Sequence, residues 1–193
     1  IRTPVLEAPM LSRQFGCDLF LKMECLQHTS SFKARGALNA MIGLSAEQRK
    51  KGVIAMSAGN HAQAVAYHAE RMGIPATIVM PAQTPFAKVA RTRAFGATVV
   101  LEGRNLNECE GTVNQYIDKQ ALTMIHPYDN ELAIMGQGTA GLEMLTDVTD
   151  FDILVVPIGG GGLISGIATI ARDMRPNIKI YGVQTELYPT MKL

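Results

Sequence analysis

Short runs of apolar and β-branched residues alternate along the chain with longer stretches in which apolar positions recur every three or four residues. The short runs predict buried strands, and the longer stretches predict amphipathic helices. The predicted strands cover residues 18–23, 53–56, 76–80, 98–101, 123–125, 152–158 and 179–184. The predicted helices cover residues 33–42, 61–72, 85–95, 106–119, 131–146 and 163–174. Strands and helices that alternate in this way indicate an α/β fold, with parallel sheets covered by helices on both faces.

The composition narrows the class of partner. Hydrophobic residues make up 47% of the chain, which is enough for a folded core. The charges of 18 Lys and Arg nearly cancel those of 17 Asp and Glu, so the net charge predicts no general attraction to nucleic acid or to an anionic membrane. No apolar stretch approaches the length of a membrane span. Cys17, Cys25 and Cys109 are odd in number and lack C-x-x-C pairing, which argues against a disulfide framework and a zinc site. We therefore expect a cytoplasmic protein that binds a small molecule and no metal.

The two ends of the chain suggest a fragment. It begins at Ile1 without a methionine, and it stops at Leu193 soon after a predicted strand. We therefore expect a longer natural chain, in which the fold continues past the C-terminus seen here.

A lysine stands at the start of the first predicted helix. Lys33 follows Ser30, Ser31 and Phe32, so its amine is expected near the first helical turn. The positive end of a helix disfavours an ammonium, which helps to keep the amine neutral and nucleophilic toward an aldehyde. A solvated surface lysine is the ordinary alternative, and two further loops of matching chemistry weigh against it.

The first of these loops is Ser57-Ala58-Gly59-Asn60-His61, between strand 53–56 and helix 61–72. Backbone amides at such a junction face the carboxyl end of the strand, where they suit a carboxylate. Asn60 can also bond a phenolic oxygen, and Ser57 supplies a hydroxyl. Taken alone, the loop is explained equally well as an ordinary turn, in which Ser57 caps the following helix and Gly59 relieves backbone strain.

The second loop is Gly159-Gly160-Gly161-Gly162-Leu163, between strand 152–158 and helix 163–174. Without side chains, several amides can reach one phosphate group. Dinucleotide binding is the main alternative, but the G-x-G-x-x-G spacing fails because Ile164 and Ser165 stand where its last glycine would be. Combined with Lys33, this loop indicates a pocket for pyridoxal phosphate, a phosphorylated aldehyde.

A second glycine-containing segment and the four histidines allow more than one interpretation. Gly136-Gln137-Gly138-Thr139 either lines the pocket from the opposite side or forms a turn between domains. The four histidines, His28, His61, His68 and His126, show no metal-ligand spacing, so most are expected to be structural.

These motifs closely resemble those of the threonine/serine dehydratase group of fold-type II pyridoxal-phosphate enzymes, which also includes serine racemase. The resemblance runs nearly end to end. It is carried by Leu21-Lys22-Met23-Glu24, Ser31-Phe32-Lys33-Ala34-Arg35-Gly36, Ser57-Ala58-Gly59-Asn60-His61-Ala62-Gln63, His126-Pro127-Tyr128-Asp129, Gly136-Gln137-Gly138-Thr139 and Pro157-Ile158-Gly159-Gly160-Gly161-Gly162-Leu163. It implies two open parallel-sheet domains of the tryptophan synthase β kind. Residues 1–51 and 133–193 would form a large, incomplete cofactor-binding domain, and residues 52–132 a small domain that closes on the substrate.

The resemblance also implies roles for individual residues. Lys33 would be the catalytic lysine that forms a Schiff base with pyridoxal phosphate, with Phe32 packed by the cofactor ring and Asn60 at its 3-hydroxyl oxygen. The phosphate would be held by Gly159, Gly160, Gly161, Gly162 and Leu163. The substrate carboxylate would be held by Ser57, Ala58, Gly59, Asn60 and His61.

The activity implied is dehydration and deamination of L-threonine, L-serine or both to a 2-oxo acid and ammonia, in isoleucine biosynthesis or threonine catabolism. A homo-oligomer, either a dimer or a tetramer, is expected from the same group. Serine racemases carry a second serine where this chain has Ala58, and that serine acts as the base on the other ring face. Ala58 therefore favours a dehydratase over a racemase or a lyase for another hydroxy amino acid.

An inactive fragment that only binds the cofactor is the alternative of another class. In the group that the chain resembles, the partner of the pyridine nitrogen and a cation site lie beyond the equivalent of Leu193.

Overall fold

The computed structural model describes residues 1–191, in which helices and strands alternate along most of the chain. The strands are β1 Val5–Glu7, β2 Phe20–Lys22, β3 Val53–Met56, β4 Ala76–Met80, β5 Thr98–Leu101, β6 Thr123–Met124, β7 Ile153–Pro157 and β8 Lys179–Val183. The helices are α1 Pro9–Phe15, α2 Lys33–Ile42, α3 Ala46–Lys51, α4 Asn60–Met72, α5 Phe86–Arg93, α6 Leu106–Gln120, α7 Glu131–Asp147 and α8 Gly162–Met174. Two short 3-10 turns, Glu24–Leu26 and His28–Ser30, precede α2. All predicted elements are present, but β1, α1 and α3 were not predicted.

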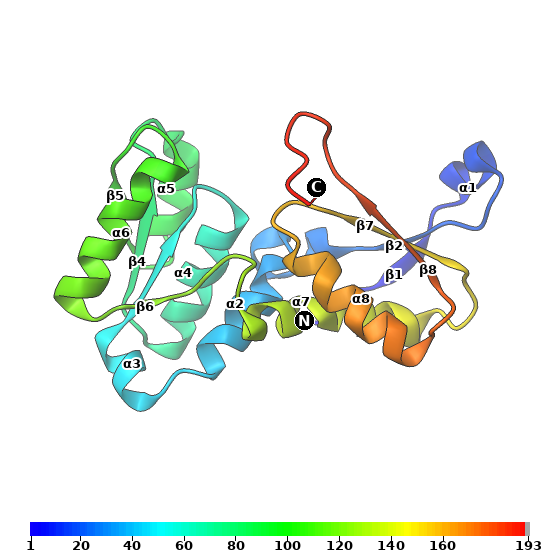
Figure 1. Ribbon diagram of the computed structural model, residues 1–193, viewed down its shortest axis with the longest axis horizontal. Coiled ribbons are helices and arrows are strands. Elements are labelled where there is room, and N and C mark those ends of the chain that lie inside the picture. Colours follow the sequence, from blue (N-terminus) through cyan, green and yellow to red (C-terminus); the bar gives the residue numbers. More distant parts are fainter. Residues whose placement is uncertain (192–193) are drawn as a thin grey trace.

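Four parallel strands form the largest sheet, in the order β5-β4-β3-β6 (Figure 1). Its central strands, β3 and β4, are largely buried on both faces because alternate residues enter different cores. Val53 and Ala55 pack with buried residues of α4, whereas Ile54 packs with Cys109 and Val113 of α6. Helices therefore cover both faces of this sheet, as the apolar pattern of its strands predicted.

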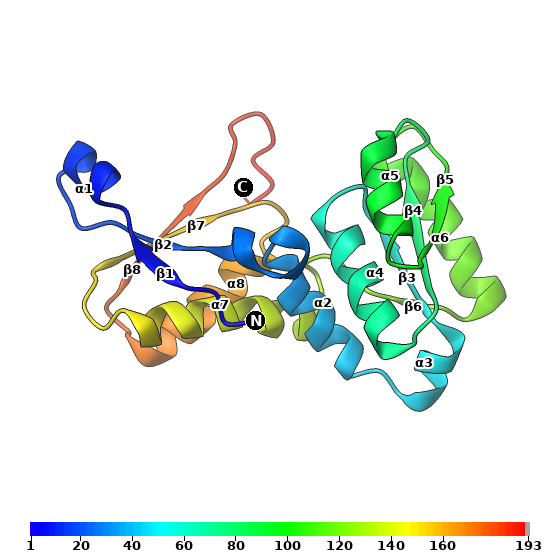
Figure 2. The ribbon, with the colours of Figure 1, turned by 180° about the vertical axis from the view of Figure 1, so that it is seen from behind.

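Two smaller sheets lie at the other end of the molecule (Figure 2). β7 and β8 are parallel, and Leu154 and Val156 of β7 share a core with Ile167 and Ala171 of α8. β1 and β2 form an antiparallel pair. The prediction of parallel strands was therefore wrong for the segment at residues 18–23, because the intervening residues, which include α1, reverse the chain and bring β2 back beside β1.

Helices α2, α7 and α8 pack against one another through glycines. A Cβ atom on Gly136 would lie 2.6 Å from the Arg35 carbonyl oxygen, and one on Gly138 would lie 2.9 Å from the Gly166 carbonyl oxygen. The segment Gly136-Gln137-Gly138-Thr139 thus lies inside α7. The interpretation as a turn between domains was therefore wrong, because these glycines lie within a helix and allow close approach of helix backbones. Gly136 and Thr139 line a cavity between α2 and α4, and a contact with the cofactor pocket stays a prediction.

The large sheet with its helices occupies one end of the molecule, and the two small sheets occupy the other (Figures 1 and 2). Helix α2 links the two ends, since it packs against both α4 and α7. The division into residues 52–132 and two flanking parts stays a prediction, because packing does not say which part moves. Among the described residues, no helix has the length and apolar character that crossing a membrane requires.

Candidate functional site

Lys33 is the first residue of α2, and Ser31 helps to fix it there. The Lys33 amide donates a hydrogen bond to the Ser31 hydroxyl at 3.2 Å. The Lys33 amine donates to the Pro127 carbonyl oxygen at 2.5 Å and lies 5.3 Å from the centre of the Phe32 ring. Burial lowers the pKa of Lys33 to about 8, because the ammonium form loses hydration. A substantial fraction of this amine is therefore neutral and nucleophilic near physiological pH.

The segment of residues 125–129, between β6 and α7, connects Lys33 with the other predicted loops. Its Ile125 carbonyl accepts a hydrogen bond from His61 Nε2 at 2.7 Å, and its Pro127 carbonyl accepts from Lys33. His126 Nδ1 accepts from the Asp129 amide at 2.7 Å, which makes a tight turn. Tyr128 then lies against the glycine loop. The motif from His126 to Asp129 is part of the family resemblance, but its residues carry no role that the sequence predicts.

The glycine loop packs so closely that side chains would not fit at three of its four positions. A Cβ atom would lie 2.3 Å from the Tyr128 ring at Gly160, 2.9 Å from Met191 Sδ at Gly161 and 2.9 Å from Tyr128 Cα at Gly162. Gly161 also has a φ of 85°, which favours glycine. Helix α8 begins at Gly162, so the amides of its first turn have no partner within the helix. This arrangement suits a phosphate group.

Leu163 follows the four glycines and packs against the core beside β7 and α8. Its side chain is therefore occupied, and only its backbone amide can take the predicted part in phosphate binding.

The loop from Ser57 to His61 joins β3 to α4 at the carboxyl end of the large sheet. The Ser57 hydroxyl accepts from the Gly59 amide at 3.2 Å, Ala58 packs against the core, and Asn60 is exposed. The His61 side chain is 4% exposed and turns inward to Ile125. Backbone amides, Ser57 and Asn60 can therefore take part in ligand binding, whereas the His61 imidazole faces the protein interior.

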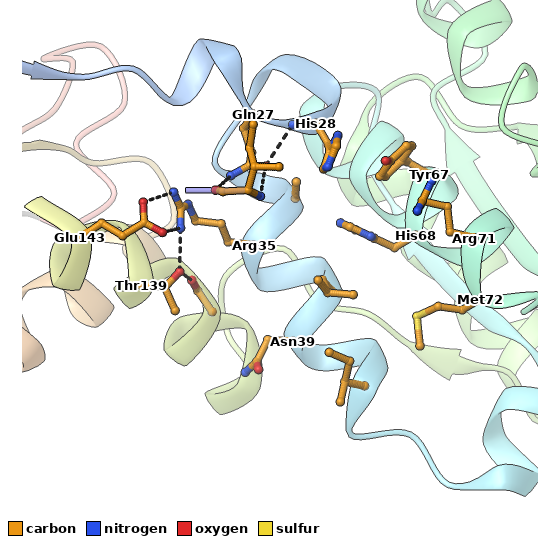
Figure 3. A pocket seen from close by; sticks show the side chains of 15 residues that line it. Gln27, His28, Arg35, Asn39, Tyr67, His68, Arg71, Met72, Thr139 and Glu143 are labelled. Atoms are coloured by element: carbon orange, nitrogen blue, oxygen red, sulfur yellow. Dashed lines mark hydrogen bonds and ion pairs between the residues drawn. The ribbon is translucent and has the colours of Figure 1, made fainter. Parts of the chain in front are cut away.

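A buried charge cluster around Arg35 ties α2 to α7 (Figure 3). The Arg35 guanidinium pairs with Glu24 at 2.7 Å and with Glu143 at 2.7 Å, and it donates to the Thr139 hydroxyl at 3.1 Å. Burial works to raise the pKa of Glu143, but the bonds from Arg35 and Lys22 outweigh it and hold that pKa at about 2. This cluster was not predicted from the sequence, because its members lie far apart along the chain.

A cavity of about 580 Å³ opens between α2 and α4 (Figure 3). Tyr67, His68 and Arg71 of α4 line it opposite α2. His68 is 5% exposed, and burial lowers its pKa to about 4, although a bond to the Ala34 backbone works to raise that pKa. None of the residues predicted to bind substrate or cofactor lines this cavity.

The residues around segment 125–129 fit a phosphorylated aldehyde. The buried Lys33 amine, at Pro127, can attach to an aldehyde. The glycine loop, which packs on the next residue, Tyr128, has first-turn amides that can bind a phosphate. Fold and site together fit the class of α/β protein that binds a phosphorylated aldehyde.

Comparison with known proteins agrees with this class. Residues 1–192 match the family model described as pyridoxal-phosphate dependent enzyme. The chain is 48% identical over 190 residues to an L-threonine ammonia-lyase of Thermotoga maritima, covering 98% of this chain and 47% of that protein. The chain belongs to the pyridoxal-phosphate dependent enzyme family, which confirms the cofactor and the fold class predicted from the sequence.

Solved structures give the same result. The processed form of threonine deaminase isoform 2 from Solanum lycopersicum superposes with a TM-score of 0.95 at 42% identity, over 99% of this chain and 53% of that one. Maize serine racemase superposes with a TM-score of 0.95 at 38% identity, over 98% of this chain and 57% of that one. The chain therefore spans about half the length of the relatives that it matches.

Proposed function

We propose that the protein containing this chain dehydrates and deaminates L-threonine, L-serine or both, giving a 2-oxo acid and ammonia. The observation that carries the proposal is the buried Lys33 amine, which donates to the Pro127 carbonyl while the next residue, Tyr128, packs on the glycine loop. The similarity to an L-threonine ammonia-lyase supports this choice of reaction.

Different residues of this chain would bind the phosphate, the ring and the aldehyde carbon of the cofactor. The amides from Gly159 to Leu163 would bind the phosphate, Phe32 would pack beside the ring, and Asn60 would contact its 3-hydroxyl oxygen. Pyridoxal phosphate, when bound, supplies a conjugated ring that makes the Cα proton of an attached amino acid acidic. Lys33 Nζ would hold the cofactor in the resting enzyme and would remove the proton from the substrate Cα once released.

The substrate carboxylate would lie over the loop from Ser57 to His61, where α4 begins. The exposed Asn60 and the first-turn amides of α4 support this placement, because an anion is stabilised at a helix N-terminus. We also propose that residues 52–132 form a small domain that closes on the substrate. Closure would exclude water from the reacting groups.

A racemase is the second candidate, because maize serine racemase superposes on the chain with the same TM-score, 0.95, as the threonine deaminase of Solanum lycopersicum. Racemisation needs an acid on the face of the ring opposite Lys33. Ala58 stands in the loop at the position where the resemblance implies a serine for that task, and a methyl group cannot move a proton. We therefore favour the dehydratase.

A direct test compares three forms of the protein as its gene encodes it: wild type, Lys33→Ala and Lys88→Ala. Lys88 is an exposed lysine of α5 and serves as the matched control. We expect wild type and Lys88→Ala to produce a 2-oxo acid and ammonia from L-threonine or L-serine, and Lys33→Ala to produce neither. Chiral chromatography that finds D-serine without a 2-oxo acid would instead identify the racemase, and cofactor binding without turnover would identify an inactive protein.

We further propose that the protein is a cytoplasmic homo-oligomer that acts in isoleucine biosynthesis or threonine catabolism. Cys17, Cys25 and Cys109 are all free thiols, which supports a reducing compartment. Size-exclusion chromatography with light scattering would establish the oligomeric state, and a monomer would contradict this part of the proposal.

A further inference from the structure

The His61 side chain has a role that the motif around it does not suggest. Its Nε2 lies 2.7 Å from the Ile125 carbonyl oxygen, and its Nδ1 is buried without a partner among the described residues. Burial lowers the pKa of His61 to about 4, and the bond to Ile125 only partly offsets that effect. At neutral pH the ring therefore carries a single N–H, and the carbonyl fixes it at Nε2.

Ile125 is held from two sides. Its amide donates to the Ile54 carbonyl of β3 at 2.9 Å, and its carbonyl accepts from His61 of α4. Two residues further on, the Pro127 carbonyl accepts from the Lys33 amine at 2.5 Å. The ring of Pro127 restricts its own φ, and His126 Nδ1 ties the following turn together. The peptide that His61 holds is therefore connected to the Pro127 carbonyl through only two residues, and the motion of this short segment is restricted.

We propose that His61 is a positioning residue for Lys33, acting through the Ile125 carbonyl and the backbone of residues 125–127. The inference rests on the role proposed for Lys33. Without a donor at residue 61, the Ile125 carbonyl loses its buried partner and the segment moves toward water. Water then reaches the Lys33 amine, and the amine is no longer held in one place for the cofactor aldehyde.

The test uses a near-isosteric pair in the protein as its gene encodes it. His61→Gln keeps an N–H donor, whereas His61→Met fills the space without one. Thr92→Val is the matched control, because the Thr92 hydroxyl of α5 is also a buried donor to a backbone carbonyl, that of Lys88 at 3.0 Å, and it makes no hydrogen bond to residues 125–129 among the described residues. Circular dichroism establishes that each variant is folded.

Two quantities are measured. The first is the pKa of Lys33 in cofactor-free protein, obtained from competitive acylation over a pH series with mass spectrometry of the peptide that contains Lys33. The second is the dissociation constant of pyridoxal phosphate, obtained from its visible absorption.

For His61→Met we expect the pKa of Lys33 to rise by about one unit or more, because the amine regains water, and cofactor binding to weaken about tenfold. We expect His61→Gln and Thr92→Val to stay near wild type in both quantities. If His61→Met leaves both unchanged, or if Thr92→Val shifts them equally, the inference is wrong. If His61→Met does not fold, His61→Gln decides: a rise of about one unit in the pKa of Lys33 and about tenfold weaker cofactor binding in this variant, which keeps the donor, would overturn the inference as well.

The outcome is separable from that of the proposed function. Acylation of Lys33 in cofactor-free protein does not depend on which substrate is turned over. A wild-type protein that makes no 2-oxo acid would therefore refute the dehydratase while leaving the result for His61 intact.

Discussion

Replacing Arg35 by methionine removes the central cation of the buried cluster that holds α2. Arg35 bonds Glu24 through its Nε at 2.8 Å and one terminal nitrogen at 2.7 Å, and it bonds Glu143 through both terminal nitrogens at 2.7 Å. The Arg35 side chain is 7% exposed, and the two carboxylates are 16% and 13% exposed. Arg35→Met therefore leaves two poorly hydrated carboxylates. Among the described residues 1–191, Glu143 keeps a cationic partner, Lys22 at 2.6 Å, and Glu24 keeps none.

The expected cost is about 3 kcal/mol of unfolding free energy. Removing one partner of a buried ion pair typically costs about 3–5 kcal/mol, and the lower end applies because both carboxylates keep some contact with water. The assay is urea unfolding at pH 7, followed by circular dichroism. Arg104→Met is the control, because Arg104 forms an exposed pair with Glu108 and is 87% exposed.

The double variant Arg35→Met/Glu24→Gln should recover part of the loss, because Glu24 is the carboxylate that loses its cationic partner, whereas Glu143 keeps Lys22. The reasoning is refuted if Arg35→Met lowers the unfolding free energy no more than Arg104→Met does. It is equally refuted if the double variant is less stable than Arg35→Met alone.

Three further predictions concern packing and ionisation. Gly136→Ala should destabilise by about 1–3 kcal/mol, since its Cβ would lie 2.6 Å from the Arg35 carbonyl oxygen, and a neutral result in urea unfolding would refute the close helix crossing. Gly111→Ala, in an open position of α6, should instead stabilise by up to about 1 kcal/mol. The rate at which cofactor-free protein captures pyridoxal phosphate should rise with pH about a midpoint near 8, because the neutral Lys33 amine is the reactive form, and a midpoint near 10.5 would contradict its burial. Glu143 has a pKa lowered from 4.5 to about 2, so its contribution to stability is present above pH 4.5 and is lost as the pH falls toward 2. Glu143→Gln should therefore flatten the acid limb of the stability curve, and an unchanged slope would argue against the cluster.

The sequence predicted most of the fold because its signals are local. Strands β3 to β7 are short apolar runs, and α2, α4 and α6 have regular apolar periodicity. The short elements escaped prediction for the same reason. β1 has three residues, none of them buried, and α1 has no buried residue, so neither leaves an apolar pattern. Helix α3 is polar and held by a capping box from Ser45.

In the candidate site, the residues with a local signal were predicted and their distant partners were not. Lys33 and the glycine loop stand out because their residue types are unusual at a junction of strand and helix. Their partners were missed because they come from distant parts of the chain: the Pro127 carbonyl is 94 residues from Lys33, and Glu143 is 108 residues from Arg35. Backbone acceptors such as Pro127 carry no signal in the sequence, since every residue has a carbonyl.

The proposed function depends above all on Lys33 as the residue that holds pyridoxal phosphate. The most direct measurement is borohydride reduction of the cofactor-loaded protein, followed by proteolysis and mass spectrometry to locate the lysine that has become covalently linked. We expect a single modified lysine, Lys33, and no modification in protein that carries Lys33→Ala. Modification of a different lysine, or stable cofactor binding with no modified lysine, would contradict it.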